Sequence, residues 1–65
     1  MDSEKIAIKL TGLRGEKSRE QVARDLGISV SAVAMYETGA RIPRDEIKKR
    51  IADYYQVSVE SIFFE

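Results

Sequence analysis

Apolar residues recur along the chain at intervals of three and four positions, which is the spacing of one face of an α-helix. In the first segment Ile6, Leu10 and Leu13 share such a face, and Gly15 is expected to end the helix. Short amphipathic segments of this kind continue to the end of the chain, and no stretch has the strict alternation of a strand. The pattern predicts an all-α fold of five short helices.

The second helix is delimited by residues that favour helix ends. Ser18 and Gln21 form a capping-box pair at its start, and Gly27 stands at the position of a C-cap about eight residues later. Its predicted inward face consists of Val22, Ala23 and Leu26.

The third helix is predicted to start after Ser29, which suits an N-cap, and to end at Gly39. Val33 and Tyr36 are expected to face the core. Glu37 closes this helix and Arg14 closes the first, and we expect a structural ion pair between them.

Pro43 is expected to be the first residue of the fourth helix, and Asp45 and Glu46 suit its positive end. Lys48 and Lys49 are expected to point outward, within a solvated face whose charges pair internally. The predicted inward residues are Ile47, Ile51, Tyr54 and Tyr55, followed by a fifth helix that is capped by Ser58 and carries Val59, Ile62 and Phe63.

The second and third helices, with the short glycine-containing turn between them, have the spacing of a helix-turn-helix unit. Ala23 is small where the two helices would cross, and Gly27 can adopt the left-handed conformation that the turn requires. Ile28 and Val33 are expected to fill the seam. A helix held in this way presents its other face to solvent, where it can enter a DNA major groove.

The ordered residues 18–29, Val33, 37–43 and 51–63 resemble the Cro and phage-repressor type of helix-turn-helix family. The resemblance extends over essentially the whole chain and implies a compact five-helix λ-repressor-like domain, residues 1–65, that binds double-stranded DNA. The connection between Lys17 and Ser18 is shorter than usual in this family, so the first helix is expected to end early or to dock differently.

The resemblance also implies where DNA would be contacted. The start of the second helix would hold a phosphate, the exposed start of the third would face base edges, and the segment after it would follow the phosphate backbone. The implied DNA-facing residues are Arg19, Gln21, Ser29, Val30, Ser31, Met35, Thr38, Arg41 and Arg44. The third helix lacks Arg, Asn and Gln, the strong readers of base edges, so specificity is expected from dimer spacing, DNA shape or water.

The amino-acid composition excludes several kinds of functional site. The 65 residues include no cysteine and no histidine, which excludes disulfides, thiolate or imidazole metal sites and Cys or His catalysis. We therefore expect no enzyme, no metal, no cofactor and no small-molecule substrate. The N-terminus is polar, with no apolar stretch for a signal peptide or a membrane anchor, so a cytoplasmic location is expected.

Eleven basic and eleven acidic residues balance, with eight basic and six acidic side chains in residues 1–44. This weak positive excess is compatible with a repressor-like regulator that binds a short operator. The alternative is a protein-interaction or antitoxin-like module whose partner contacts Val30, Ala34 and Met35. A continuous positive strip around Arg19, Arg41 and Arg44 would favour DNA, and interruption by Glu20 and Glu37 would favour a protein.

The last apolar residues predict self-association. Ile62, Phe63 and Phe64 cannot all pack inward at the end of so short a chain, so one Phe should stay exposed. We expect the three residues to form a two-fold dimer interface on the last helix, which makes the DNA-binding form a homodimer.

Overall fold

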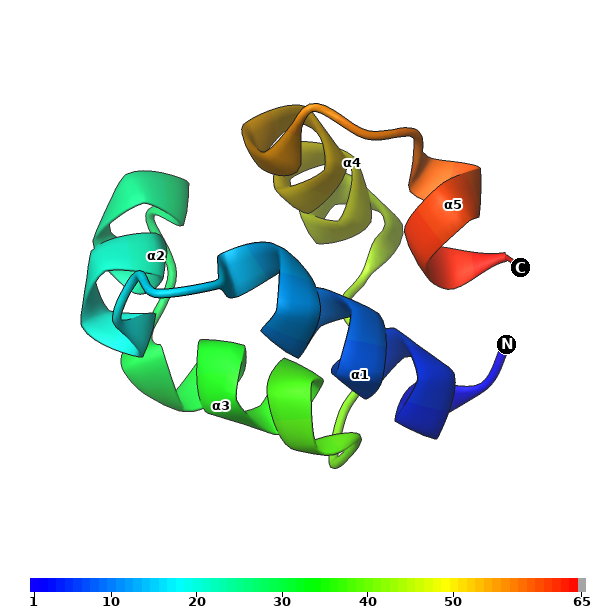
Figure 1. Ribbon diagram of the computed structural model, residues 1–65, viewed down its shortest axis with the longest axis horizontal. Helices are drawn as coiled ribbons and strands as arrows, with labels where there is room; N and C mark the ends of the chain where they lie inside the picture. The colour runs from blue at the N-terminus through cyan, green and yellow to red at the C-terminus, as the bar shows by residue number, and fades with distance from the viewer. Residues whose placement is uncertain (65) are drawn as a thin grey trace.

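The computed structural model describes residues 1–64, and that part of the chain contains five α-helices and no strand. They are α1 (Ser3–Arg14), α2 (Arg19–Leu26), α3 (Val30–Thr38), α4 (Asp45–Tyr55) and α5 (Val59–Phe63) (Figure 1). The predicted all-α, five-helix fold is confirmed. The short connection after α1 is accommodated because α1 already ends at Arg14.

Side-chain oxygens cap four of the helices at their starts. Asp2 accepts from the backbone N–H groups of the first turn of α1. Ser18, Ser29 and Ser58 each accept from the N–H three residues later, at 3.0–3.1 Å. The capping box at Ser18 is only half formed, because the Gln21 amide donates to Asp25 at 2.8 Å instead of reaching back.

Two glycines end the helices that form the helix-turn-helix unit. Gly27 after α2 has φ 71° and Gly39 after α3 has φ 81°, both left-handed. An L-residue with a Cβ is strained in this conformation, so glycine lets the chain reverse here at little cost.

The core forms where the inward faces of all five helices meet. It contains Ile6, Leu10, Val22, Ala23, Leu26, Val33, Tyr36, Ile47, Ile51, Ala52, Ile62 and Phe63. Leu13 was expected in this core, but it is 36% exposed and borders a surface hollow between α1 and the residues around α5. Pro43 is also misplaced by the prediction: α4 begins at Asp45 with Arg44 as its N-cap, and Pro43 is buried in the preceding connection.

Lys48 contradicts the expectation that it points outward. It is only 7% exposed, and its ammonium lies 5.9 Å from the ring centroid of Phe63 and 5.3 Å from that of Phe64. The aliphatic stem is covered by α5, and the charge pairs with Asp45 at 3.2 Å. The docking of α5 buries this lysine, and the pattern within α4 carries no sign of it.

Polar groups connect α4 to α2. The Tyr54 hydroxyl donates to Asp25 at 2.6 Å and accepts from Lys17 at 3.1 Å. The hydrogen bond from Tyr54 lowers the pKa of Asp25 below its ordinary value. A guanidinium nitrogen of Arg50 donates to the carbonyl of Leu26 at 2.8 Å, which satisfies an otherwise free oxygen at the end of α2. Arg50 is therefore engaged with the helix-turn-helix turn as well as with its neighbour Glu46.

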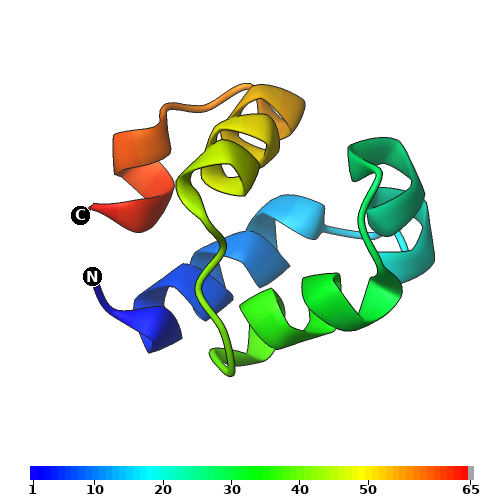
Figure 2. The same ribbon diagram turned by 180° about the vertical axis from the view of Figure 1, so that it is seen from behind.

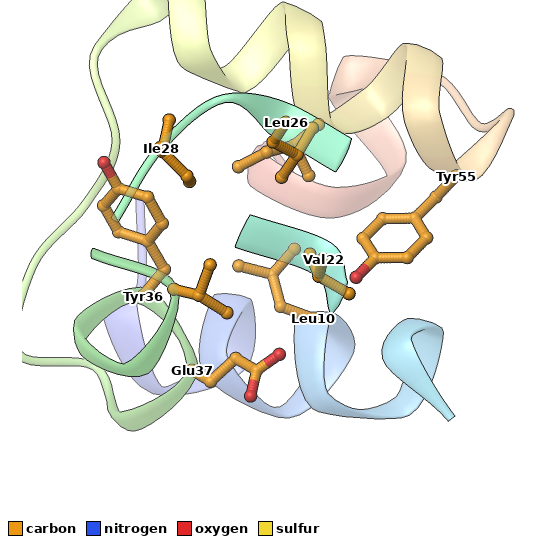
Figure 3. Close-up of a pocket in the computed structure, with 9 residues that line it drawn as sticks. Leu10, Val22, Leu26, Ile28, Tyr36, Glu37 and Tyr55 are labelled. Carbon is orange, nitrogen blue, oxygen red and sulfur yellow. The ribbon is translucent and has the colours of Figure 1, made fainter. Parts of the chain in front are cut away.

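A cavity of about 10 Å³, too small for more than one water molecule, remains inside the core (Figure 3). Tyr55 lines it with Leu10 and Val22. Burial, followed by the nearby Glu37 carboxylate, raises the pKa of Tyr55 to about 12.

Replacing glycine by alanine is expected to have opposite effects at two positions. Gly12 lies inside α1 with nothing within 4 Å of an added Cβ, so Gly12→Ala should stabilise the fold by about 0.5–1 kcal/mol. Gly39 has positive φ, and the added Cβ would lie 3.4 Å from the Ser3 carbonyl oxygen, so Gly39→Ala should cost about 1–2 kcal/mol. Urea unfolding of both variants measures this. Effects of the same sign would contradict it.

Stability is expected to fall in alkali through Tyr55. The folded state keeps the Tyr55 proton up to about pH 12, whereas the unfolded chain releases it near 10.0. Between these values the unfolded state binds fewer protons, so the free energy of unfolding decreases as pH rises. Urea unfolding at about pH 9 and about pH 11 should show a larger loss for the wild type than for Tyr55→Phe. Parallel losses in the two proteins would rule this contribution out.

Candidate nucleic-acid interface

Helix α3 lies along one edge of the molecule and is uncovered on its outer side (Figures 1 and 2). It packs against α1 and α2 through its inner face, where Val33, Tyr36 and Glu37 are buried. Val30 and Ser31 are exposed in its first turn, and Ala34 and Met35 are half-buried further along. The predicted division of this helix into a core face and a free face is thus present.

The turn between α2 and α3 is held by backbone hydrogen bonds. The Ile28 N–H donates to the Ala23 carbonyl at 3.0 Å, and the Gly27 N–H donates to the Arg24 carbonyl at 3.3 Å. Ala23 is 3% exposed, in keeping with its predicted place at the helix crossing. Together with the hydrogen bond from Arg50, these contacts fix the orientation of α3 relative to α2.

The carboxylate of Glu37, with a side chain only 2% exposed, accepts from two arginines. Arg14 Nε donates to its two oxygens at 3.0 and 2.9 Å, which makes the predicted ion pair between α1 and α3. Arg19 Nε donates to Oε1 at 2.9 Å from the start of α2. The hydrogen bond to Glu37 raises the pKa of Arg14 above its ordinary value. One carboxylate therefore ties three helices together.

Arg19, the predicted phosphate ligand on α2, has its Nε bound to Glu37 but retains a side chain that is 38% exposed. Its two terminal nitrogens have no hydrogen-bond partner among residues 1–64. Gln21, the second predicted ligand at this end, is half-buried, and its amide is occupied by Asp25 and Arg24. Arg19 is the better placed of the two to meet a phosphate.

The remaining predicted residues lie at the two ends of α3 and beyond it. Ser29 is exposed, and its hydroxyl already caps the helix through Ala32. Thr38 is exposed in the last turn. Arg41 and Arg44 are exposed on the connection to α4, and neither forms an ion pair within the described part of the chain. The backbone of this connection is anchored where the Arg41 N–H donates to the Met35 carbonyl.

Acidic interruption of the basic surface is smaller than the sequence suggests. Glu37 is buried and paired with two guanidinium groups, so it presents no negative charge to solvent. Glu20 is exposed beside Arg19 and does remain as a negative group at the start of α2. Of the two glutamates that were expected to interrupt the positive strip if the partner were a protein, only Glu20 therefore presents its charge to solvent.

Three contacts at this surface were not expected from the sequence. These are the second arginine on Glu37, the Arg50 hydrogen bond to the turn, and the Tyr36 side chain, which borders a surface hollow beside Arg41. The first two join residues from different helices and the third brings α3 beside the connection that follows it, and the local pattern carries no signal for such placements.

The last apolar residues divide as expected between core and surface. Ile62 and Phe63 are 2% and 1% exposed, whereas Phe64 is 59% exposed. A contact between subunits at this place would therefore rest on Phe64, because the other two side chains are already covered.

A family model described as helix-turn-helix matches residues 13–62, well over half of the chain. The chain therefore belongs to this helix-turn-helix family, of the Cro/C1 type. It is a DNA-binding transcriptional regulator. Comparisons with curated proteins and with solved structures gave no match. Within residues 1–64, no helix combines the length and apolar character needed to cross a membrane.

The two ion pairs of Glu37 are expected to differ in strength. In double-mutant cycles with Glu37→Gln, the coupling to Arg14→Met should be about 2 kcal/mol, and the coupling to Arg19→Met about 1 kcal/mol or less. The reason is exposure, since the Arg14 side chain is 19% exposed and that of Arg19 is 38% exposed. Urea unfolding measures both, with the exposed Arg24→Gln as the control. A stronger coupling to Arg19 would contradict this order.

Proposed function

We propose that this regulator is repressor-like, that residues 1–65 form a single DNA-binding domain, and that two copies bind a short operator. The observation that carries the proposal is the uncovered face of α3, with partly or fully exposed arginines on the elements that precede and follow it. Arg19 is the first residue of α2, and Arg41 and Arg44 are exposed on the connection that follows α3.

In this arrangement α3 enters the major groove while the arginines meet phosphates on either side. Ser29, Val30, Ser31 and Met35 would face the base edges, and Thr38 would lie near the backbone with Arg41 and Arg44. Val30 is 40% exposed and suits contact with thymine methyl groups. Such contacts discriminate weakly, so operator choice depends largely on the spacing of two half-sites and on DNA shape.

The dimer is proposed to form near the last helix, with Phe64 as its exposed aromatic contact. Two-fold symmetry would then set two α3 helices about 34 Å apart, which is one turn of DNA. The protein is proposed to act in the cytoplasm. It is also proposed not to be an enzyme, because DNA-binding regulators of this family are typically not enzymes.

A protein-interaction module is the second candidate. It is favoured by the apolar character of the exposed surface, where Val30 and Ile42 are 40% and 37% exposed. It predicts binding that is insensitive to the arginines, and this difference separates it from the leading proposal.

The test is a titration of fluorescent duplexes with variants of the arginines. Arg41→Gln and Arg44→Gln should each weaken binding to every duplex and lower the slope of log affinity against log salt by about 1. Ser31→Ala and Met35→Ala should instead change the preference among sites selected from random DNA. Selected sites should contain two half-sites about one helical turn apart.

Lys49→Gln is the matched control for this titration. Lys49 is exposed on α4 two positions from the buried Ile47, so it points to another side of that helix, and its loss removes the same charge. Binding to DNA should be unchanged in this variant. Failure to bind any duplex at low salt, or equal binding by the arginine variants, would refute the proposal.

A further inference from the structure

A hollow of about 350 Å³ lies between α3, the connection at residues 39–44 and the start of α4. Ligand pockets in proteins begin at roughly 300 Å³, so a small molecule would fit. The hollow is lined by Ile28, Tyr36, Arg41, Ile42, Arg44 and Ile47. Its lining therefore combines three isoleucines with two arginines.

Tyr36 is a lining residue of this hollow whose hydroxyl has no partner within the described part of the chain. Its side chain belongs to the core and is 8% exposed as a residue, yet its hydroxyl has no hydrogen-bond partner among residues 1–64. No fully buried side-chain polar atom of those residues lacks a partner, so the hydroxyl is accessible to solvent, and Tyr36 is among the residues that line the hollow. Figure 3 shows it pointing away from the small core cavity. A donor held in this position is suited to a ligand oxygen.

The first turn of α4 adds positive potential on the same side. Its N-cap, Arg44, makes no side-chain hydrogen bond to the helix, so the first N–H groups lack a side-chain acceptor. The acidic residues of that turn are engaged elsewhere, since Asp45 pairs with Lys48 and Glu46 lies 4.0 Å from Arg50. Arg41 and Arg44 have no ion-pair partner within the described residues. The hollow is thus lined by two arginines without an ion-pair partner in that part of the chain, and the exposed carboxylates of Asp45 and Glu46 lie in the adjoining first turn of α4.

We propose that this hollow binds a small organic anion, a carboxylate with a short unbranched apolar chain. The carboxylate accepts from Arg41, Arg44 and the Tyr36 hydroxyl, and the chain lies against Ile28, Ile42 and Ile47. Both parts are needed: the isoleucines offer nothing to a bare inorganic anion, and a neutral molecule leaves the guanidinium groups without a counter-charge.

Binding of such an anion has a consequence for regulation, which rests on the proposed function. Arg41 and Arg44 are the same groups that are proposed to meet the DNA backbone. A ligand that occupies them competes with a phosphate, so DNA binding becomes weaker as the anion accumulates.

The first arm of the test uses the protein without DNA. Hexanoate is titrated into ¹⁵N-labelled protein, with hexanamide and inorganic phosphate as probes that lack the charge or the apolar chain. Hexanoate should shift the amide signals of residues 36–47 with a Kd of about 1 mM, and the other two should bind at least about tenfold more weakly. Tyr36→Phe keeps the buried ring and should weaken hexanoate binding about fivefold, and Arg44→Gln about tenfold.

Lys49→Gln should bind hexanoate as the wild type does, and thermal unfolding by circular dichroism verifies that each variant is folded. No shifts at residues 36–47 would overturn the proposal, as would full binding by Tyr36→Phe. Equal binding of phosphate and hexanoate would also overturn it, because the site would then be a plain anion site such as a DNA phosphate occupies.

The second arm measures competition with the selected DNA duplex. Hexanoate should raise the apparent Kd for DNA more than hexanamide with sodium chloride at matched ionic strength. Hexanoate binding without competition would overturn the regulatory part alone. Failure to bind any DNA would refute the proposed function and leave the ligand site to be judged by the first arm.

Discussion

The carboxylate of Glu37 is the point on which the arrangement of the first three helices depends. A charge this deeply buried is unfavourable unless it is paired, and here Arg14 and Arg19 approach it from α1 and α2. These two ion pairs hold the C-terminal end of α3, which is far from the helix-turn-helix turn, against both helices. Arg50 and Gly27 fix the other end. An interface helix clamped at both ends presents its outer face as a rigid unit.

The same pairing shapes the electrostatics of the surface. Because Glu37 is neutralised inside the fold, an overall neutral chain can still carry uncompensated guanidinium groups around α3. Arg19 has its Nε on the carboxylate and its terminal nitrogens directed to no other group of residues 1–64. Arg41 and Arg44 sit beyond the end of the helix on a backbone anchored at Met35. Net charge is therefore a poor guide to this surface, and the position of each partner decides the local field.

The proposed DNA contacts and the proposed ligand site share the same two arginines, Arg41 and Arg44. In the proposed complex α3 offers methyl groups and hydroxyls to DNA, so much of the affinity would come from the flanking phosphate contacts. The hollow beside α4 lies among those contacts and adds the Tyr36 hydroxyl to them. If the proposed arginine contacts carry much of the affinity, an anion that occupies the same arginines can modulate it.

The sequence by itself determined the five helices and most of their ends, the start of α4 excepted. Serine caps and left-handed glycines act over three or four residues, so their effect can be predicted from local spacing, and the position of the turn followed from them. The interior of α3 was also predictable, because a buried face repeats with the helical period. Tertiary structure decided which side chains are buried by residues that lie far away in the sequence. Lys48 is covered because α5 docks on it, Leu13 stays partly exposed at a surface hollow, and Arg19 reaches Glu37 only when α2 and α3 pack. Burial and ion pairing between helices depend on how the helices are placed in space, and a one-dimensional pattern does not encode that placement locally.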